Sequence, residues 1–216
     1  MTPAVVVVVV TKRRGRLGAL VMALLVLGLG ACASLPVRPQ AGVAERAQSA
    51  PSYSARLEVT LRGKGLRART LALVAFRRPD ALRVEVPGPA GARILAVARA
   101  ERLVAVFPGD RAVFQGRATA ADLGALLGVA LEPAEVMDLL VGTPPKDVRG
   151  FEARWGPEAP RRIKAQLPDG TRIDLTIEEP RLSPELPERA FLDPPHQGYR
   201  PVDAEEARAL WSGRRS

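Results

Sequence analysis

A run of alternating apolar and polar residues begins at Tyr53 and constrains the fold of this chain more than any other feature. Tyr53, Ala55, Leu57, Val59 and Leu61 alternate with serine, threonine and charged residues. Successive side chains of a β-strand point to opposite faces, so this pattern predicts a strand with one buried and one solvated face. A sheet that starts in this way needs an apolar layer against its buried face.

Short turn sequences separate this strand from the strand patterns that follow it. Gly63-Lys64-Gly65 and Arg78-Pro79-Asp80 are two of these turns, and Asp169-Gly170 between two alternating runs is a strong hairpin signal. Connections this short join antiparallel neighbours. The sequence therefore predicts an antiparallel meander followed by a hairpin, with strands over residues 53–62, 66–77, 82–86, 93–98, 103–107, 111–114, 151–155, 161–167 and 171–178.

The spacing of apolar residues changes to a helical period at Thr119. Thr119 and Asp122 form a capping-box pattern, and a second helix is expected from Pro133, a residue that suits a first helical turn, to Gly142. Both helices have an apolar side. The only large apolar surface available to them is the inner face of the sheet, so we expect them to cover it.

The N-terminal region has the pattern of a bacterial lipoprotein signal peptide. Lys12, Arg13, Arg14 and Arg16 precede an apolar stretch over residues 17–31, which is too short for a comfortable membrane span. The stretch ends in Leu29, Gly30 and Ala31 before Cys32, and these residues resemble the lipobox, whose cysteine is acylated. We expect cleavage before Cys32 and lipid attachment there. The alternative is an ordinary signal peptide or membrane anchor with an incidental thiol.

The remainder of the chain is predicted to hold one domain. The net charge of the chain is +9, and removal of residues 1–31, with four cations and no acidic residue, leaves +5. Residues 32–52 are expected to form a lipidated N-terminus and a flexible tether with a reach of roughly 20 to 25 Å. The domain would span residues 53–203, with Leu186, Phe191 and Leu192 anchoring its proline-rich end. Residues 204–216 would form a short C-terminal helix, capped by Asp203, and a tail.

Catalytic chemistry is not indicated by this sequence. His196 is the sole histidine and lies in a proline-rich turn, where a surface position is expected, and Cys32 is the sole cysteine. No nucleophile elbow, phosphate-binding glycine loop or metal-ligand spacing is present in the sequence. We therefore expect no enzyme activity, no catalytic residue, no cofactor and no metal site, and the function class that is favoured is binding.

The order of these features resembles the LolA/LolB superfamily, and within it most closely the outer-membrane lipoprotein receptors of the LolB kind. The resemblance depends on the lipobox, on Arg83-Val84-Glu85-Val86 running into Pro87-Gly88-Pro89-Ala90-Gly91, and on Leu140-Val141-Gly142-Thr143-Pro144 after two helices. It implies a mainly β fold with α-helices: a half-open antiparallel β-barrel covered by short lid helices, with an apolar cavity that holds acyl chains such as palmitate.

The resemblance, together with the strand and helix periodicity, predicts the residues of an acyl-chain cavity. We expect this cavity to be lined by Leu57, Val59, Leu61, Leu82, Val84, Val86, Leu95, Val97, Leu123, Leu126, Leu127, Val136 and Leu140. In LolB the loop corresponding to Pro89, Ala90 and Gly91 faces the membrane and presents a leucine. Ala90 occupies that position here and offers less apolar area.

The predicted function is that of a lipoprotein in the periplasm that binds lipoprotein acyl chains or other lipids and inserts lipoproteins into the outer membrane as a chaperone. In the enterobacterial lipoprotein system, which this N-terminal region resembles, an aspartate after the cysteine retains a protein in the inner membrane; Ala33 occupies that position here, so the resemblance favours the outer membrane. The implied partners are the membrane, through the lipid anchor, and a periplasmic LolA-like carrier; no nucleic acid is expected, and the protein is expected to be a monomer. The alternatives are a glycolipid or phospholipid shuttle of the same fold and a structural or assembly lipoprotein with a packed core.

Overall fold

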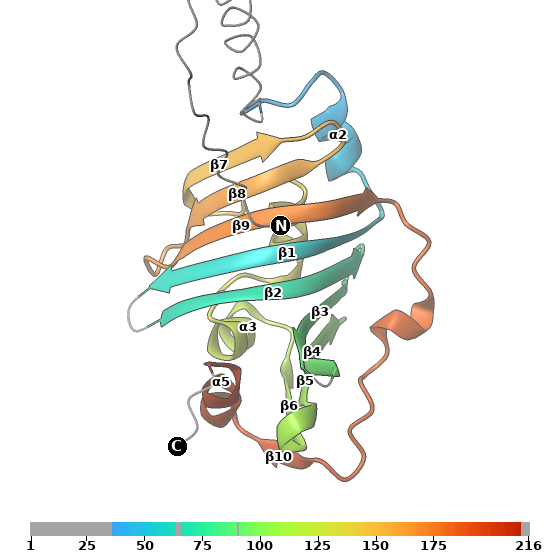
Figure 1. The fold of residues 1–216 in the computed structure, drawn as a ribbon, viewed down its shortest axis with the longest axis vertical. Coiled ribbons are helices and arrows are strands. Elements are labelled where there is room, and N and C mark those ends of the chain that lie inside the picture. The colour runs from blue at the N-terminus through green and yellow to red at the C-terminus, as the bar shows by residue number, and fades with distance from the viewer. Residues whose placement is uncertain (1–35, 64–65, 90, 213–216) are drawn as a thin grey trace, which may run out of the picture. The chain divides into compact units, whose positions relative to one another are not determined.

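One sheet of ten strands curves around a layer of helices (Figure 1). The computed structural model describes residues 36–63, 66–89 and 91–212. The strand order is β10-β6-β5-β4-β3-β2-β1-β9-β8-β7, and the outermost strands β10 and β7 are not paired with each other. All strand pairs are antiparallel except β10 with β6. The prediction of a mainly β, half-open antiparallel barrel with helices is confirmed.

The predicted meander and hairpin are present, with ends that differ by a few residues. The strands are β1 (Ser52–Gly63), β2 (Leu66–Arg77), β3 (Ala81–Gly88), β4 (Gly91–Arg99), β5 (Arg102–Phe107), β6 (Ala112–Arg117), β7 (Arg149–Trp155), β8 (Pro160–Gln166), β9 (Arg172–Leu182) and β10 (Arg200–Val202). The helices are α2 (Val43–Gln48), α3 (Ala120–Leu127), α4 (Pro133–Leu140) and α5 (Ala204–Ser212), with the 3-10 turns η1 (Pro108–Asp110) and η2 (Glu188–Phe191). Strand β10 was not expected from the sequence.

Local hydrogen bonds determine where the two helices under the sheet begin. The Thr119 hydroxyl accepts a hydrogen bond from the Asp122 backbone N–H at 3.3 Å, as the capping pattern predicts. Helix α4 begins with Pro133 after a capping box formed by Glu132 and Glu135. These caps satisfy backbone N–H groups that a helix leaves without intrahelical partners.

A long-range pairing joins the last hairpin to the first strand of the domain. Strand β9 pairs with β1, and Leu57 lies opposite Ile177 while Leu61 lies opposite Ile173. The apolar faces of β1 and β9 therefore point to the same side of the sheet. This pairing extends the inner face across β8 and β7, while strands β2 to β6 lie on the other side of β1.

The positions of β4 that face the main core are shifted by one residue relative to the prediction. Ile94, Ala96 and Ala98 belong to the main core, whereas Leu95 packs against a second cluster of valines and Tyr199, and Val97 also alternates away from the main core. Every residue from 94 to 98 is apolar, so the sequence contains no alternation that distinguishes the two faces. Both faces of β4 are buried, and the expectation that Leu95 and Val97 line the cavity is wrong.

The segment predicted to be a flexible tether contains a helix that packs on the domain. In α2, Val43 and Ala47 lie one turn apart and are buried in the main core, and Ala50 is also buried. Upstream of the helix, the Pro36 carbonyl accepts a hydrogen bond from the Trp155 N–H at 2.8 Å. The prediction of a tether through residue 52 is therefore wrong. The unit from Leu35 contains every strand and the buried core that the structure describes, so we expect it to fold by itself.

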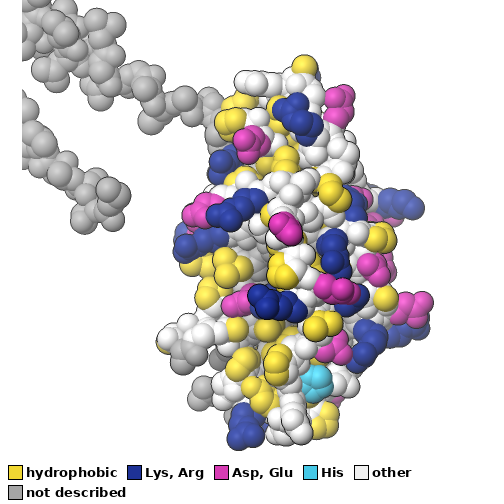
Figure 2. Space-filling view, turned by 90° about the vertical axis from the view of Figure 1, so that its right-hand side faces the viewer, with side chains coloured by type: hydrophobic (Ala, Val, Ile, Leu, Met, Phe, Trp, Pro, Cys, Tyr) yellow, Lys and Arg dark blue, Asp and Glu magenta, His cyan; other side chains and the backbone are white. Residues whose placement is uncertain are grey.

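The proline-rich segment after β9 runs along the side of the sheet and is fastened by side chains. Phe191 is fully buried and Leu186 is half-buried, whereas Leu192 is 53% exposed, so the prediction that Leu192 is an anchor is wrong. Arg99 pairs with Glu188 and Arg102 pairs with Asp193. Figure 2 shows cationic and acidic side chains interspersed on this side of the molecule.

His196 holds the same segment against β6. Its Nδ1 lies 2.7 Å from the Pro194 carbonyl oxygen and therefore carries the proton, which leaves Nε2 to accept from the Gln115 amide at 3.0 Å. Both ring nitrogens have structural partners. Helix α5 follows and belongs to the same domain, because Ala207 is buried in the main core and α5 packs against α3.

Candidate functional site

An apolar cleft lies between the inner face of the sheet and the helices α3, α4 and α5. Its volume is about 100 Å³, and its lining comes from β1, β2, β3, β9 and the three helices. Only Thr70 and Trp211 bring side-chain polar atoms to this lining. The cleft can therefore accept a hydrocarbon group, and it offers almost no hydrogen bonds to a polar ligand.

Most of the predicted cavity residues meet at this cleft. Val86 and Leu126 lie in the same main core without lining the cleft, and Leu95 and Val97 face away from it, as described above. The predicted residues that line it are Leu57, Val59, Leu61, Leu82, Val84, Leu123, Leu127, Val136 and Leu140.

Other lining residues were not predicted, although some of them carried a signal in the sequence. Ile173 and Leu175 alternate with polar residues in the last hairpin, whereas the part of β2 around Ala72 and Val74 is apolar at every position and shows no alternation. Trp211 had no such signal, because its place depends on how α5 docks. The residues that the prediction missed are Thr70, Ala72, Val74, Val129, Leu139, Ile173, Leu175 and Trp211.

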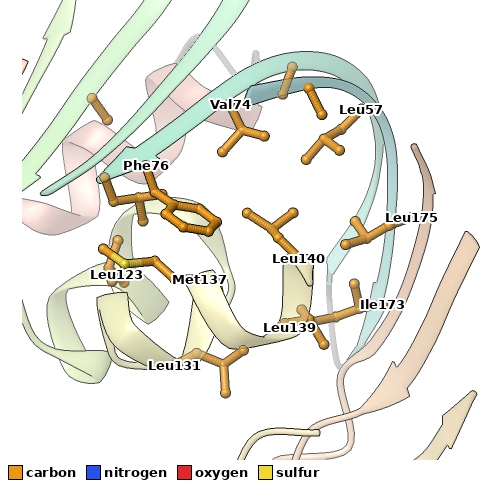
Figure 3. Packing of buried hydrophobic residues seen from close by; sticks show 14 of the residues in the cluster. Leu57, Val74, Phe76, Leu123, Leu131, Met137, Leu139, Leu140, Ile173 and Leu175 are labelled. Atoms are coloured by element: carbon orange, nitrogen blue, oxygen red, sulfur yellow. The ribbon is translucent and has the colours of Figure 1, made fainter. Parts of the chain in front are cut away.

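Side chains of α4 occupy most of the space beneath the sheet. Figure 3 shows Leu140 in the space enclosed by Leu57, Val74 and Leu175. The remaining volume of about 100 Å³ is smaller than the pockets of about 300 Å³ or more that hold small ligands, and smaller than a cavity of about 150 Å³ that accepts one benzene molecule. A long acyl chain would fit only after the helices move away from the sheet.

Few polar interactions hold α3 and α4 in place. Asp138 of α4 pairs with Arg78 at 2.7 Å, the Glu132 carboxylate accepts from the Ala120 N–H at 2.9 Å, and Asp122 accepts from the Arg117 N–H at 2.6 Å. The other contacts of these helices with the sheet are largely aliphatic. Such contacts have little directional preference, so the helices can shift relative to the sheet without breaking many hydrogen bonds.

Trp211 brings a buried hydrogen-bond donor to the edge of the cleft. Its indole Nε1 is shielded from solvent and has no hydrogen-bond partner among the described residues. Buried donors usually have partners, and the desolvation of an unpaired donor costs about 1 to 3 kcal/mol. A ligand with a carbonyl oxygen could supply the partner.

Two predicted sites lie wholly or partly outside the described residues. Leu29, Gly30, Ala31 and Cys32 lie outside them, and so does Ala90 of the predicted membrane-facing loop; its neighbours Pro89 and Gly91 are exposed. Among the residues that the structure describes, no helix is both long and apolar enough to cross a membrane, and no three metal-binding side chains lie together.

The outer face of the sheet carries ion pairs. Arg162 of β8 donates to both carboxylate oxygens of Asp174 in β9, at 2.9 and 2.7 Å. The hydrogen bond from Arg162 is the largest cause that lowers the pKa of Asp174, and the nearby charges of Arg162, Lys164 and Arg62 lower it further. The carboxylate is thus favoured over the protonated form in the folded protein.

Replacing Asp174 with asparagine is expected to weaken the acid dependence of stability. Because folding lowers the pKa of Asp174, its contribution is present above the unfolded pKa and is lost as the pH falls through the folded pKa. The pair is partly exposed, so we expect a contribution of about 1 kcal/mol or less. Urea unfolding of the variant and the parent at neutral pH and at about pH 3 measures how much stability each loses on acidification. An equal loss of stability on acidification in Asp174→Asn and the parent would contradict the prediction.

Comparisons with known proteins find similarity at the level of solved structures. The chain matches no protein-family model and no curated protein. It is similar to a LolA superfamily protein from Nitrosomonas europaea, with 14% identity, coverage of 72% of this chain and 98% of that chain, and a TM-score of 0.43.

Two further solved structures are similar to this chain. One is a DUF1329 family protein from Desulfovibrio piger, with 9% identity, coverage of 77% of this chain and 100% of that chain, and a TM-score of 0.41. The other is described as an outer membrane lipoprotein-sorting protein domain from Vibrio parahaemolyticus, with 10% identity, coverage of 68% and 92%, and a TM-score of 0.37.

Proposed function

We propose that this protein is a lipid-anchored envelope protein that holds acyl chains between its curved sheet and helices α3, α4 and α5. It receives lipoproteins and passes them to the outer membrane without covalent chemistry. The observation that carries the proposal is the apolar cleft, whose lining is almost free of polar atoms. The helices that cover it make few hydrogen bonds and ion pairs with the rest of the domain.

Binding would begin with movement of the helices away from the sheet. An acyl chain that replaces the side chains of α4 against β1, β2 and β9 gains about 0.8 kcal/mol for each methylene group that leaves water, less the burial that the displaced side chains lose. The aliphatic lining has no fixed polar partners along the acyl chain, so it accepts acyl groups of different lengths. The indole N–H of Trp211 would donate to the ester or amide carbonyl at the head of the acyl chain.

Attachment of lipid at Cys32 would hold the domain close to the bilayer. Pro36 is already hydrogen-bonded to Trp155, so only residues 33–35 separate Cys32 from the folded domain. Four fully extended residue steps span about 14 Å, less than the reach expected of a longer flexible tether. The position of Ala33 after the cysteine favours the outer membrane, and a periplasmic carrier of the LolA kind would deliver the client.

A structural lipoprotein is the second candidate, and the small volume of the cleft favours it. The cleft of about 100 Å³ leaves most of the inner face packed against helices, as in an ordinary core. Such a protein would scaffold an envelope complex through its surface and would bind no acyl chain. A glycolipid or phospholipid shuttle of the same fold shares the mechanism above and differs only in its ligand.

A phenylalanine in place of Ala72 tests the acyl site. Ala72 lies in β2 and lines the cleft, and a phenyl ring there would occupy the space that a ligand needs. The matched control is Ala75→Phe, which adds the same ring to the outer face of the same strand. We expect the chain from Leu35 to bind a triacylated lipopeptide in native mass spectrometry, with Ala72→Phe weakening the binding about tenfold or more and Ala75→Phe leaving it unchanged.

The outcomes separate the candidate functions. Overpacking at Ala72 costs about 1 to 3 kcal/mol, so circular dichroism is used to check that both variants are folded. Equal binding by the two variants would place the ligand elsewhere. A parent that binds neither lipopeptide nor phospholipid would favour the structural lipoprotein, whereas a glycolipid or phospholipid extracted from detergent-free preparations would favour the shuttle.

A further inference from the structure

A row of arginines crosses the outer face of the sheet, on the side opposite the cleft. Strand pairing places Arg62 of β1 directly opposite both Arg67 of β2 and Arg172 of β9. The row continues through Gln166 of β8, which lies opposite Arg172, to Arg149 of β7, which lies opposite Gln166. These five residues form the arginine row, which crosses five adjacent strands and contains no carboxylate.

The arginines of the row have no ion pair among the described residues, unlike other cations of the same face. Arg69 pairs with Glu58, and Arg162 pairs with Asp174. Side chains directly opposite in adjacent strands have Cβ atoms about 4.5 to 5.5 Å apart, and like charges in these positions destabilise a sheet. The row therefore carries a repulsion that an anion lying across it would relieve.

A groove of about 660 Å³ follows this face and provides room for such an anion. It is lined by six cationic side chains and two carboxylates, and both carboxylates already have arginine partners. The end of β1 and the start of β9 lie at the same end of the sheet in Figure 1, and Arg62, Arg67 and Arg172 are exposed. Guanidinium groups present planar pairs of N–H donors that match phosphate oxygens.

Exposed leucines lie farther along the outer face of β2 and point to a bilayer as the source of the phosphates. Leu71 and Leu73 are 38% and 45% exposed. They follow Arg67 and Arg69 at alternate positions of β2 and so share its outer face. Arginines together with exposed aliphatic side chains are typical of surfaces that lie in the headgroup region of a membrane. An acidic protein partner would be bound through the arginines, and this binding would not require the exposed leucines.

We propose that the arginine row docks the outer face of the sheet onto a membrane by binding the phosphate groups of anionic lipid headgroups. The choice of a membrane as partner rests on the proposed function, which places the domain beside a bilayer. The headgroup site and the acyl cleft lie on opposite faces of the same strands. Docking would thus hold the sheet against the surface while helices α3 and α4 remain free to move.

Vesicle sedimentation of the chain from Leu35 tests this docking surface. The vesicles contain phosphatidylcholine alone or phosphatidylcholine with phosphatidylglycerol. We expect the parent to sediment with the anionic vesicles only, and less at higher salt, because screening weakens contacts between exposed charges. The triple variant Arg62→Gln, Arg67→Gln and Arg172→Gln should partition about tenfold or more less strongly onto them, since each cation at an anionic surface contributes.

A matched triple variant removes the same charge elsewhere. Arg117, Arg189 and Arg208 are exposed, and their replacement by glutamine should leave sedimentation close to that of the parent. Equal losses in the two triple variants would overturn the proposal, because net charge alone would then explain the binding. A parent that does not distinguish the two vesicle types would overturn it as well.

Soluble anions distinguish the membrane from other sources of negative charge. Poly-L-glutamate stands for an acidic protein and inorganic phosphate for a free anion. Tight binding of poly-L-glutamate without vesicle binding would assign the row to an acidic protein and overturn the membrane proposal. Vesicle binding that millimolar phosphate does not displace supports it. Lipopeptide binding by the Arg62, Arg67 and Arg172 variant should be unchanged, so failure of the docking surface is distinguishable from failure of the acyl site.

Discussion

Alanine in place of Gly142 is expected to lower the free energy of unfolding by about 3 kcal/mol or more. Gly142 follows α4 and has a φ of +83°, a conformation that residues with a Cβ rarely adopt. A Cβ at this position would lie 2.6 Å from Cζ2 of Trp155 and 3.0 Å from Cγ of Pro160. Backbone strain and steric overlap therefore add, and urea unfolding of the chain from Leu35 measures their sum.

Gly170 provides the matched control for this substitution. It has a φ of +87° in the turn before β9, but a Cβ there would meet nothing within 4 Å. Gly170→Ala should therefore show the backbone strain without the overlap, about 1 kcal/mol. Equal effects of the two substitutions would mean that Trp155 does not pack against Gly142. The end of α4 would then not lie against β7 and β8.

A chain that begins at Pro51 is expected to be about 3 kcal/mol less stable than one that begins at Leu35. The shorter chain lacks α2 and so loses the burial of Val43, Ala47 and Ala50, together with the hydrogen bond between Pro36 and Trp155. Full burial of a valine side chain contributes about 1.5 to 3 kcal/mol, and each further methyl group about 0.8 kcal/mol. Chemical unfolding of the two chains measures the difference.

Two point substitutions test the same segment without shortening the chain. Val43→Ala should cost about 1.5 kcal/mol, because it removes two buried methylene-sized groups. Val37→Ala should change stability by less than about 0.5 kcal/mol, because Val37 is 56% exposed. If the Pro51 chain or Val43→Ala were as stable as the parent, the segment would be the flexible tether that its composition suggests.

The strands could be predicted wherever only one of their faces is buried. In β1 and β3 the apolar residues alternate with charged ones, so the sequence itself shows which side chains point inward, and Leu57, Leu61 and Leu82 line the cleft as expected. In β4 the other face is covered by a segment that includes Tyr199, and the alternation disappears. Burial from both sides removes the contrast on which the prediction depends.

The segment of residues 35–52, which was predicted to be a tether, shows a second way in which composition misleads a prediction of structure. Alanine, glutamine and proline between residues 35 and 52 are common in linkers, yet Val43 and Ala47 form a buried face of α2. A helix of six residues is too short to be stable alone, and its stability comes from contacts with the sheet. Those contacts are made with a core to which distant parts of the chain contribute, so the composition of the segment does not show them.

The sequence indicates most of the elements, although not α2 or β10, and it indicates their antiparallel connections within the meander and the apolar faces of β1, β3, α3 and α4. These properties depend on periodicity and on turn chemistry, which act over a few residues. The tertiary structure alone decided that β9 pairs with β1, that Trp211 reaches the cleft, and that Arg62, Arg67 and Arg172 stand in one row. Each of these placements depends on contacts between residues far apart in the chain, whose relative positions no local pattern specifies.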